Sequence, residues 1–294
     1  MVKKRSGKLK IKGVNPSHFD TSQLKIYFYV IPIAIVMLLP IIFIFVNAFK
    51  PMDELFAYPP RLFVRHPTLQ NFKDLFAVSL ATDVPASRYL VNTIISTVLT
   101  VALTLFISVA AGYVFSKKRS KSVAFLFGVN SLALMFVTTA VAIPRYFVIV
   151  YSGLIDSFLA NIIPLLVTPV GVFLVKQFID QLPNALIEAA EIDGASDFQI
   201  LRKIIMPLVK PTMATLTILT FQSAWNSTEA SSFYLNDESL KTFAFYMSNL
   251  STGNGVAGQG IGAAATLIMF LPNLILFIIL QSKVMNTMAF SGIK

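Results

Sequence analysis

The sequence has no cysteine, only two histidines and a single tryptophan among its 294 residues. Without cysteine, disulfide bonds and thiolate metal sites are excluded. His18 and His66 both lie in polar stretches, and two imidazoles are too few for a histidine-based metal site. We therefore expect no metal site in this chain.

Signatures of nucleotide binding are missing as well. Neither G-x-x-x-x-G-K-[ST], which cradles phosphates, nor the dinucleotide pattern G-x-G-x-x-G occurs in the chain. If the protein uses ATP, another subunit must bind it. We expect no cofactor in this chain.

Charged residues are also scarce, at 13%, whereas 55% of residues are hydrophobic and the mean hydropathy is +0.72. A soluble domain of this size could not hide so much apolar surface. Because backbone amides in lipid must bond within their own segment, long apolar runs predict helices. Each run below can cross a hydrocarbon core of roughly 30 Å, so we expect an all-α integral membrane protein with six transmembrane helices. The runs lie at about 26–49, 89–115, 122–143, 157–175, 212–230 and 261–281.

Several of these runs contain proline, which a helix bundle tolerates when neighbours satisfy the freed carbonyl groups. The first holds Pro32 and Pro40, and the sixth holds Pro272. The fourth is interrupted by Pro164 and Pro169 and is the least regular of the six.

The basic residues indicate the topology. An arm at residues 1–24 is rich in lysine and has one acid, Asp20, while the connection Ser116–Lys121 is wholly basic or polar. The fourth connection and the C-terminal tail are basic too, and the loops between them are near neutral. Basic loops stay in the cytoplasm, so both termini are predicted there. The net charge of +10 is spread over these loops and forms no stripe, so we expect no nucleic-acid partner.

The two long loops on the opposite side differ in composition. The loop at about 50–88 contains Pro59-Pro60, Pro67 and Pro85, which predicts a folded but irregular cap. The loop at about 231–260 ends in glycine-rich stretches. These either flex, contact a partner or are simple linkers.

A long connection at about 177–211 is neither apolar enough to span nor polar enough to be disordered. Pro183 suits the first position of a helix, and Gly194 suits a left-handed helix end. Ser196 and Gln199 form an S-x-x-Q capping box that starts a second helix, which Pro207 ends by forcing a turn. Such a helix-turn-helix either docks into a groove of another protein or is an ordinary surface loop.

This connection resembles the EAA loop of ATP-binding-cassette (ABC) importer permeases. That pattern is E-A-A, three residues, G, nine residues, I, one residue, L-P, and here it reads Glu188-Ala189-Ala190, Gly194, Ile204 and Met206-Pro207. Met for Leu is the only departure and conserves volume. In that family the loop is a coupling helix seated in a cleft of the ATPase subunit. The resemblance implies this role for Glu188, Ala189, Ala190 and Gly194, with Ile204 and Pro207 holding the loop in place.

Further stretches resemble the carbohydrate-uptake branch of that family, whose members include the smaller maltose-transporter permease. They are Leu182-Pro183, Ile192–Ser196, Ala111–Tyr113, Ile143-Pro144, Gly153-Leu154, Trp225-Asn226, Ala263–Ala265, Phe49–Pro51 and Thr68–Phe72. The resemblance implies a type I importer permease fold over residues 25–294, multi-pass in a bacterial cytoplasmic membrane. It also implies a set of partners, namely ATPase subunits that hold ATP and magnesium, a second permease that is a different chain, and an extracytoplasmic solute-binding protein.

A saccharide path needs hydrogen-bonding and aromatic side chains rather than charges. The fifth run ends in Gln222, Trp225 and Asn226, and the second contains Asn92. Unpaired amides facing lipid are costly, so we expect these amides to face a cavity or another helix. Trp225 either stacks on a sugar or anchors the chain at the membrane interface. Asn92, like Thr138 and Thr139, is explained equally well by helix-to-helix hydrogen bonds.

Other functional classes fit less well. A secondary carrier or channel predicts ionisable residues within the spans and internal repeats, neither of which is evident. A membrane enzyme predicts a cluster of acid, base and nucleophile at a membrane face. An ABC importer with another cargo, such as peptides, amino acids or acidic saccharides, is opposed only by the family branch. We expect a non-catalytic permease that works by alternating access.

Overall fold

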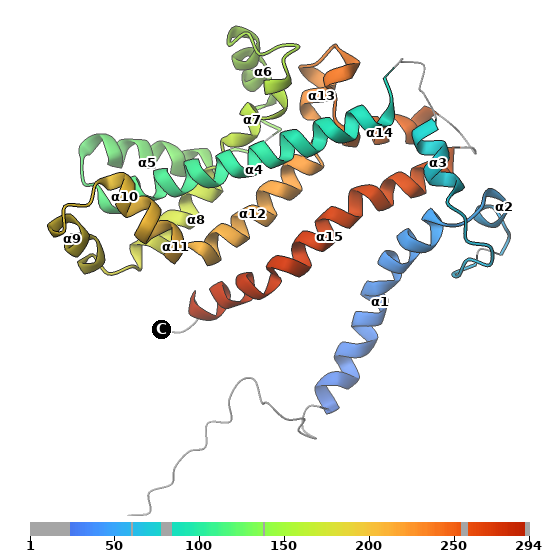
Figure 1. Cartoon of the computed structure of the whole chain (residues 1–294), viewed down its shortest axis with the longest axis horizontal. Coiled ribbons are helices and arrows are strands. Elements are labelled where there is room, and N and C mark those ends of the chain that lie inside the picture. Colours follow the sequence, from blue (N-terminus) through green and yellow to red (C-terminus); the bar gives the residue numbers. More distant parts are fainter. Residues whose placement is uncertain (1–23, 60, 78–83, 138, 254–257, 292–294) are drawn as a thin grey trace, which may run out of the picture.

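The computed structural model describes residues 24–59, 61–77, 84–137, 139–253 and 258–291, and all regular elements in these ranges are helical. The basic arm lies outside them. In Figure 1 the long helices α4 and α15 run between the two ends of the molecule, with α9 and α10 at one end and α2 and α3 at the other, and α1 extends from the end that holds α2 and α3. The elements are α1 (Leu24–Ala48), α2 (Met52–Leu55), α3 (Gln70–Ala77), α4 (Ala86–Lys117), α5 (Lys121–Ala133), α6 (Ala142–Tyr151), η2 (Phe158–Asn161), α7 (Ile163–Leu166), α8 (Pro169–Asp180), α9 (Ala185–Ile192), α10 (Asp197–Ile200), η3 (Leu201–Ile205), α11 (Met206–Leu208), α12 (Lys210–Trp225), α13 (Glu229–Phe233), η4 (Glu238–Leu240), α14 (Phe243–Gly253) and α15 (Gly258–Ser291).

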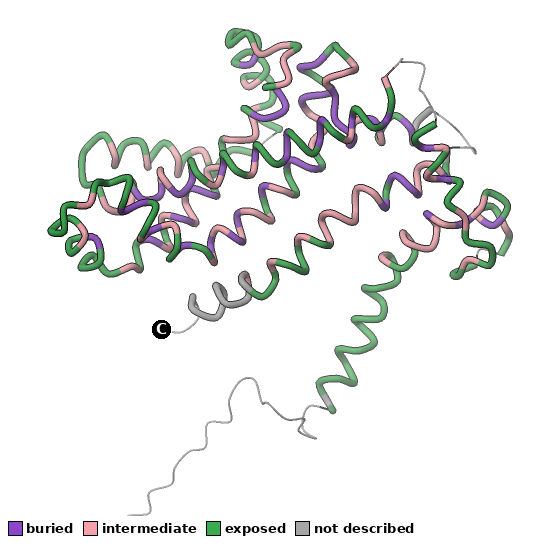
Figure 2. Tube along the Cα trace, viewed as in Figure 1, coloured by how far each residue is buried: buried purple, intermediate pink, exposed green. Residues whose placement is uncertain are grey.

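Three helices are long and apolar enough to cross a membrane, over Ile26–Ala48, Ala86–Lys117 and Gln259–Ser282. They confirm the first, second and sixth predicted runs as helices. Pro32 and Pro40 stand inside α1, as predicted. No residue of the apolar window of α1 is buried, and Figure 2 shows this helix exposed along most of its length. An apolar helix that the protein covers so little is suited to lipid.

Two further candidate spans are broken. The pair α7–α8 bends by 43°, and Pro169 is the first residue of α8, directly after the bend. The second pair joins Asp197–Leu208 to Lys210–Phe233 with a bend of 81°. Proline lacks the N–H that a continuous helix requires, which explains the interruption predicted for the fourth run. The described residues therefore contain three spans, or five if each bent pair is one span.

The third predicted run, 122–143, is not a single helix, and that prediction was wrong. Helix α5 ends at Ala133 after 13 residues, a length of about 20 Å at about 1.5 Å per residue, against a hydrocarbon core of about 30 Å. The chain turns before α6 begins at Ala142. Pro144 lies in the first turn of α6, and in an uninterrupted helix its ring would meet the carbonyl group of Ala140. Pro144 therefore explains the break directly before α6, but it lies well beyond Ala133 and does not account for the end of α5.

The centre of the bundle is the packing of α4 on α8 and α12. A Cβ atom on Gly112 would lie 2.7 Å from Cγ1 of Val175, and one on Gly171 would lie 2.7 Å from Cδ1 of Leu216. Both glycines therefore allow closer approach than alanine would. Small residues at helix contacts are typical of membrane bundles, where close packing replaces the hydrophobic driving force.

The 50–88 loop is a folded cap, as its prolines predicted, apart from residues 60 and 78–83, which are outside the described ranges. Lys50 is 3% exposed, and its Nζ donates to Asn47 Oδ1 at 2.9 Å and to the Arg61 carbonyl at 2.7 Å. Both oxygens of the Glu54 carboxylate accept backbone N–H groups, from Arg65 at 2.9 Å and from His66 at 3.0 Å. The buried ammonium of Lys50 and the carboxylate of Glu54 thus hold this loop in place, although it contains little helix.

The glycine-rich end of the 231–260 loop leads into α15. Residues 254–257 lie outside the described ranges, but Gly260 is buried at the first turn of α15. A Cβ atom there would lie 2.5 Å from Asn71 Oδ1. Asn71 in turn donates to the carbonyl groups of Ala48 and Lys50, at 3.1 and 2.7 Å. Gly260 is therefore needed for close packing of α15 against α3 and the end of α1.

Candidate functional site

The segment from Ala185 to Ile205 folds as the predicted helix-turn-helix. Helix α9 ends at Ile192, and after its C-cap Asp193 comes Gly194, whose φ of +79° is the left-handed conformation that favours glycine. Ser196 and Gln199 then form the capping box: the Ser196 hydroxyl accepts the Gln199 N–H, and the Gln199 side chain accepts the Ser196 N–H. The glycine at the end of α9 and the capping box each depend on residues only a few positions away, and both predictions are confirmed. Pro183 does not open α9; it precedes the N-cap residue Asn184, and the helix begins at Ala185.

The second helix of the pair bends later than predicted. It passes from α10 into a π-helical turn, η3, where Met206 N–H reaches back to the Leu201 carbonyl. Pro207 is the second residue of the short α11, and the 81° bend follows it at Val209. The bend therefore lies between Pro207 and Pro211 rather than at Pro207 itself. The π turn takes up the backbone bond that Pro207 cannot make.

One side of the helix pair is bound to the bundle. Ile187, Ile200 and Ile205 are buried in one apolar cluster together with Val109 and Tyr113 of α4. Val175 and Ile179 of α8 complete that cluster. The two helices therefore pack as one body on the ends of α4 and α8, which Figure 1 places beside them.

The opposite side is open. Glu188, Ala189 and Gly194 are exposed, as is Glu191. Ile192 and Phe198 are apolar and yet 87% and 58% exposed, and a soluble surface seldom leaves such side chains uncovered beside acids. Of the residues assigned to holding the loop, Ile204 is half-buried against the cluster and Pro207 is exposed.

Polar contacts tie the same helix pair to the end of α4. Lys118 Nζ lies 2.8 Å from Asp197 Oδ1, and the Tyr113 hydroxyl donates to the same oxygen at 3.2 Å. Lys117 donates to the Leu182 carbonyl and to Asn184 Oδ1. The hydrogen bond to Asp197 raises the pKa of Lys118, so this ammonium stays charged near neutral pH. We name these contacts of Tyr113, Lys117 and Lys118 the α4 brace.

The α4 brace went unrecognised in the sequence. Its lysines lie in the basic stretch that indicated topology, and a topological role accounts for them without any contact. Asp197 follows the capping serine and would be favourable there for the helix dipole alone. Nothing in the spacing pairs Lys118 with Asp197, because only the fold brings the two segments together.

The residues assigned to a solute path do not form one site. Trp225 is 4% exposed, and its indole N–H donates to the Met269 carbonyl of α15 at 3.0 Å. Its ring stacks on Phe221 with centroids 5.4 Å apart. Gln222 and Asn226 are exposed, and Asn226 donates to the backbone carbonyl of Gln222. Their part in solute transport stays a prediction.

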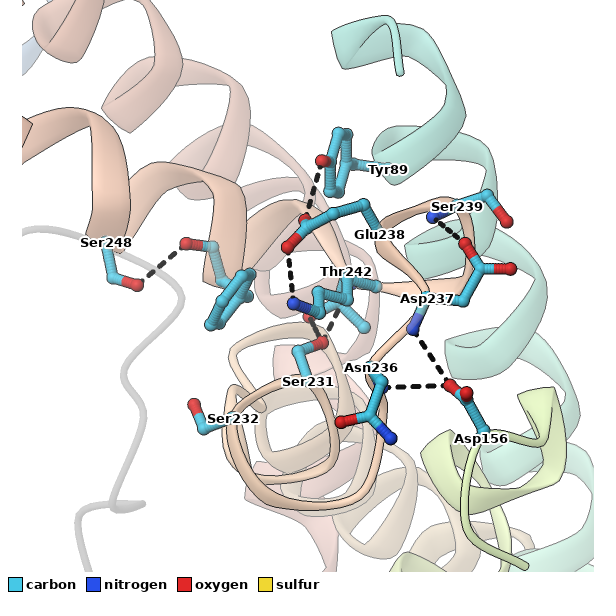
Figure 3. Close-up of polar contacts among 12 residues, drawn as sticks. Tyr89, Asp156, Ser231, Ser232, Asn236, Asp237, Glu238, Ser239, Thr242 and Ser248 are labelled. Atoms are coloured by element: carbon cyan, nitrogen blue, oxygen red, sulfur yellow. Dashed lines mark hydrogen bonds and ion pairs between the residues drawn. The ribbon is translucent and has the colours of Figure 1, made fainter. Parts of the chain in front are cut away.

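Asn92 lies elsewhere, near the N-terminus of α4. It is 3% exposed and donates to the carbonyl groups of Ser239 and Lys241, at 2.7 and 3.0 Å. Figure 3 shows the surrounding network, in which Tyr89 donates to Glu238, and Asp156 accepts the backbone N–H groups of its neighbours Asn236 and Asp237. Asn92 thus holds the 238–241 segment on α4, which is the helix-contact role that the sequence left open. Thr138 is outside the described residues.

An all-helical bundle with a helix-turn-helix at one end can be compared with known proteins. The model of the family described as binding-protein-dependent transport system inner membrane component matches residues 26–282. This chain belongs to that family. The predicted resemblance to importer permeases is thereby confirmed, and the permease is a subunit of a transport system.

Relatives match this permease over nearly their full length. The sulfoquinovosyl glycerol transport system permease protein SmoH of Agrobacterium fabrum is 28% identical, over 87% of this chain and 89% of its own. The arabinooligosaccharides transport system permease protein AraQ of Bacillus subtilis is 24% identical, over 94% and 97%. A chain of a bacterial ABC transporter involved in the import of the acidic polysaccharide alginate superposes with a TM-score of 0.71 at 21% identity, covering 90% of this chain and 98% of that one. That likeness shows a shared fold.

Proposed function

We propose that this permease lines the path of a saccharide through a bacterial cytoplasmic membrane, as one subunit of an ATP-driven importer. The observation that supports this most is the helix pair α9–α10. It carries the spacing of the EAA loop, packs rigidly on the bundle on one side and exposes acids and apolar side chains on the other. Family membership supports the same function.

The exposed side of α9 is the surface for an ATPase subunit. Glu188 and Glu191 meet basic groups there, while Ile192 fills an apolar recess. Ala189 allows close approach, since its side chain adds little bulk at that surface. ATP and magnesium bind the ATPase, and this chain performs no covalent chemistry.

The α4 brace links movement of the ATPase subunits to movement of the membrane helices. When two ATPase subunits close on ATP, a helix pair that is packed on α4 and α8 moves these helices as a rigid body. The shared apolar cluster around Ile187 and Val175 transmits the displacement, and the Lys118–Asp197 contact fixes its direction. The outcome is alternating access to a central path.

Six spans with both termini in the cytoplasm complete the proposed topology. The three long helices, the bent pair α7–α8 and helix α12 of the second pair supply five of them. Helix α5 is apolar but short, and the third span consists of α5 with the turn that follows it. The alternating basic loops support this orientation. Helices α9 to α11 then lie on the cytoplasmic side, and α2, α3 and α14 lie outside.

The cargo is a saccharide or oligosaccharide. The names of SmoH and AraQ describe transport of a sugar glycerol and of arabino-oligosaccharides. The motifs of the carbohydrate-uptake branch in this sequence support the same class. A second permease of different sequence encloses the other half of the path, and an extracytoplasmic solute-binding protein delivers the cargo to the outer loops.

Purification from the native membrane in mild detergent, with mass spectrometry of the co-purifying proteins, tests this function. We expect an ATPase and a second permease, and reconstituted vesicles should take up a radiolabelled saccharide only when they contain ATP. A stable complex without an ATPase, or uptake that a proton or sodium gradient drives instead of ATP, would favour a secondary carrier.

A further inference from the structure

A cavity of about 560 Å³ lies between α6 and α13, away from the coupling end of the bundle. Its volume is within the range of small-molecule sites, roughly 300–1,000 Å³. Four aromatic side chains contribute to its wall, which is otherwise mostly aliphatic. They are Tyr146, Phe147, Phe233 and Tyr234. Figure 1 shows α6 and α13 side by side above the middle of α4.

An ion pair stands in the wall of this cavity. Arg145 Nη1 lies 2.9 Å from both carboxylate oxygens of Glu229, and the Tyr234 hydroxyl donates to Glu229 Oε1 at 2.8 Å. The side chains of Arg145 and Glu229 are 23% and 31% exposed. A carboxylate offers about four acceptor positions, so these three contacts leave one on Oε2 for a further donor.

The same pair adjoins a second cavity. This one has a volume of about 430 Å³, and Arg145, Thr168 and Ser223 contribute to its wall. Ser223 follows Gln222 on α12, at the polar end of that helix. Glu229 therefore faces one cavity and Arg145 the other, and together they connect the aromatic cavity to the polar end of α12.

The chemistry of the cavity suits a saccharide ring. Aromatic faces pack against the C–H face of a sugar, while a fixed carboxylate accepts bonds from its hydroxyl groups. A lipid chain in the cavity would make no use of the ion pair. A transmembrane helix of a partner would have to bury the ion pair in a medium of low dielectric constant, which is costly. These features favour a hydroxyl-rich, ring-shaped ligand.

We propose that the α6–α13 cavity is a saccharide subsite of this permease, with the sugar ring against Phe233 and Tyr146 and its hydroxyls on Glu229. The subsite rests on the proposed function as a saccharide importer. It lies apart from Trp225 and Asn92, whose polar groups are used inside the bundle.

Site-directed labelling tests this proposal, because the chain has no cysteine and a single introduced thiol gives no background. The Phe233→Cys variant is assembled with its partners in nanodiscs, and its rate of reaction with a membrane-impermeant maleimide is measured. Phe63→Cys in the outer cap is the control, since Phe63 is 73% exposed against 67% for Phe233 but lies outside the cavity and outside the proposed spans. Ile143→Cys, in the same cavity, serves if Phe233→Cys does not assemble.

Maltotriose, arabinotriose and trigalacturonate are the probes, and the one that the wild-type importer takes up is used for protection. We expect that saccharide, at ten times its Kd, to slow labelling at Phe233→Cys on the order of tenfold and to leave labelling of Phe63→Cys unchanged. Labelling that the saccharide does not slow would overturn the subsite. So would a thiol that reacts only after the second permease is removed, because that permease would then occupy the cavity.

Transport kinetics give an independent measurement. Phe233→Leu keeps an apolar side chain but loses the ring face, so KM for uptake should rise by about three- to tenfold. Phe63→Leu, in the outer cap, should leave KM unchanged. If the wild type transports none of the three probes, the saccharide function itself fails; if it transports one and Phe233→Leu has wild-type KM, only the subsite fails.

Discussion

Gly194 shows how a single backbone conformation shapes the coupling surface. Its φ of +79° is open to glycine, tolerated by asparagine and unfavourable for other residues. A Cβ atom at this position would meet nothing within 4 Å, so the only cost of a larger residue is backbone strain.

The first prediction follows from that strain. Gly194→Val should cost about 1–2 kcal/mol locally and reduce ATP-driven uptake several-fold, while membrane insertion stays normal. Gly194→Asn is the matched control, because asparagine visits the left-handed region, and it should retain most of the uptake. Uptake per copy of complex is the measurement. Equal activity of the two variants would show that the turn conformation is unimportant.

Gly260 is constrained by space rather than by its dihedral angle. Asn71 cannot retreat from a new methyl group without losing its bonds to the carbonyl groups of Ala48 and Lys50. Gly260→Ala should therefore lower the free energy of unfolding by about 1–3 kcal/mol, seen as a lower Tm of the detergent-solubilised complex.

Gly262 provides the comparison on the same helix. A Cβ atom there meets nothing within 4 Å, so Gly262→Ala should leave Tm unchanged or raise it slightly, since alanine is the better helix former. A Tm for Gly260→Ala at or above that of Gly262→Ala would contradict the predicted clash.

At the scale of elements, local signals and long-range contacts differ in what a sequence can reveal. The helix end at Gly194 and the capping box at Ser196 depend on neighbours a few residues away, so the spacing predicted them correctly. The pairing of Lys118 with Asp197 depends on how α10 packs on α4, and no spacing contains that information. The long apolar runs at 26–49, 89–115 and 261–281 form single helices, as predicted. The run at 157–175 is divided among η2, α7 and α8, helix α12 ends at Trp225 within the run at 212–230, and the run at 122–143 is divided between α5 and α6. Apolar composition alone does not show where a helix is interrupted.

The α4 brace gives a prediction at this scale. The Lys118 and Asp197 side chains are 43% and 61% exposed, so their ion pair contributes little to stability, about 0–1 kcal/mol. Its role is to position the helix pair. Lys118→Asp should leave the complex intact but lower the saccharide transported per ATP hydrolysed, and adding Asp197→Lys should restore much of that ratio. If the double variant transports no more saccharide per ATP than Lys118→Asp alone, the Lys118–Asp197 pair does not position the helix pair.

The cap formed by residues 50–77 should respond to acid. Hydrogen bonds from the backbone N–H groups of Arg65 and His66 hold the pKa of the Glu54 carboxyl below its ordinary value. A lowered pKa means that the charged form stabilises the fold, so this contribution is complete above the ordinary pKa and is lost as pH falls through the lowered one.

Limited proteolysis of the cap against pH measures this effect. The wild type should resist cleavage at neutral pH and become sensitive only in strong acid. Glu54→Gln, which cannot offer two charged acceptors, should be sensitive already at neutral pH and show a weaker dependence on pH. Identical profiles for the two proteins would mean that Glu54 does not fix this loop.

At the scale of the whole molecule, the two ends of the bundle present different surfaces to partners. Ile192 at the coupling end and Phe63 in the opposite cap are apolar side chains that are 87% and 73% exposed. In the proposed assembly Ile192 fills a recess of the ATPase, whereas Phe63 lies outside the membrane. Ile192→Asp should therefore release the ATPase subunit during purification, because an unpaired carboxylate in an apolar contact costs several kcal/mol. The second permease should stay bound, since the bundle itself is unchanged, and Phe63→Asp should retain both subunits. Subunit ratios from quantitative mass spectrometry decide the matter: retention of the ATPase by Ile192→Asp at the wild-type ratio would place the coupling surface elsewhere on the chain.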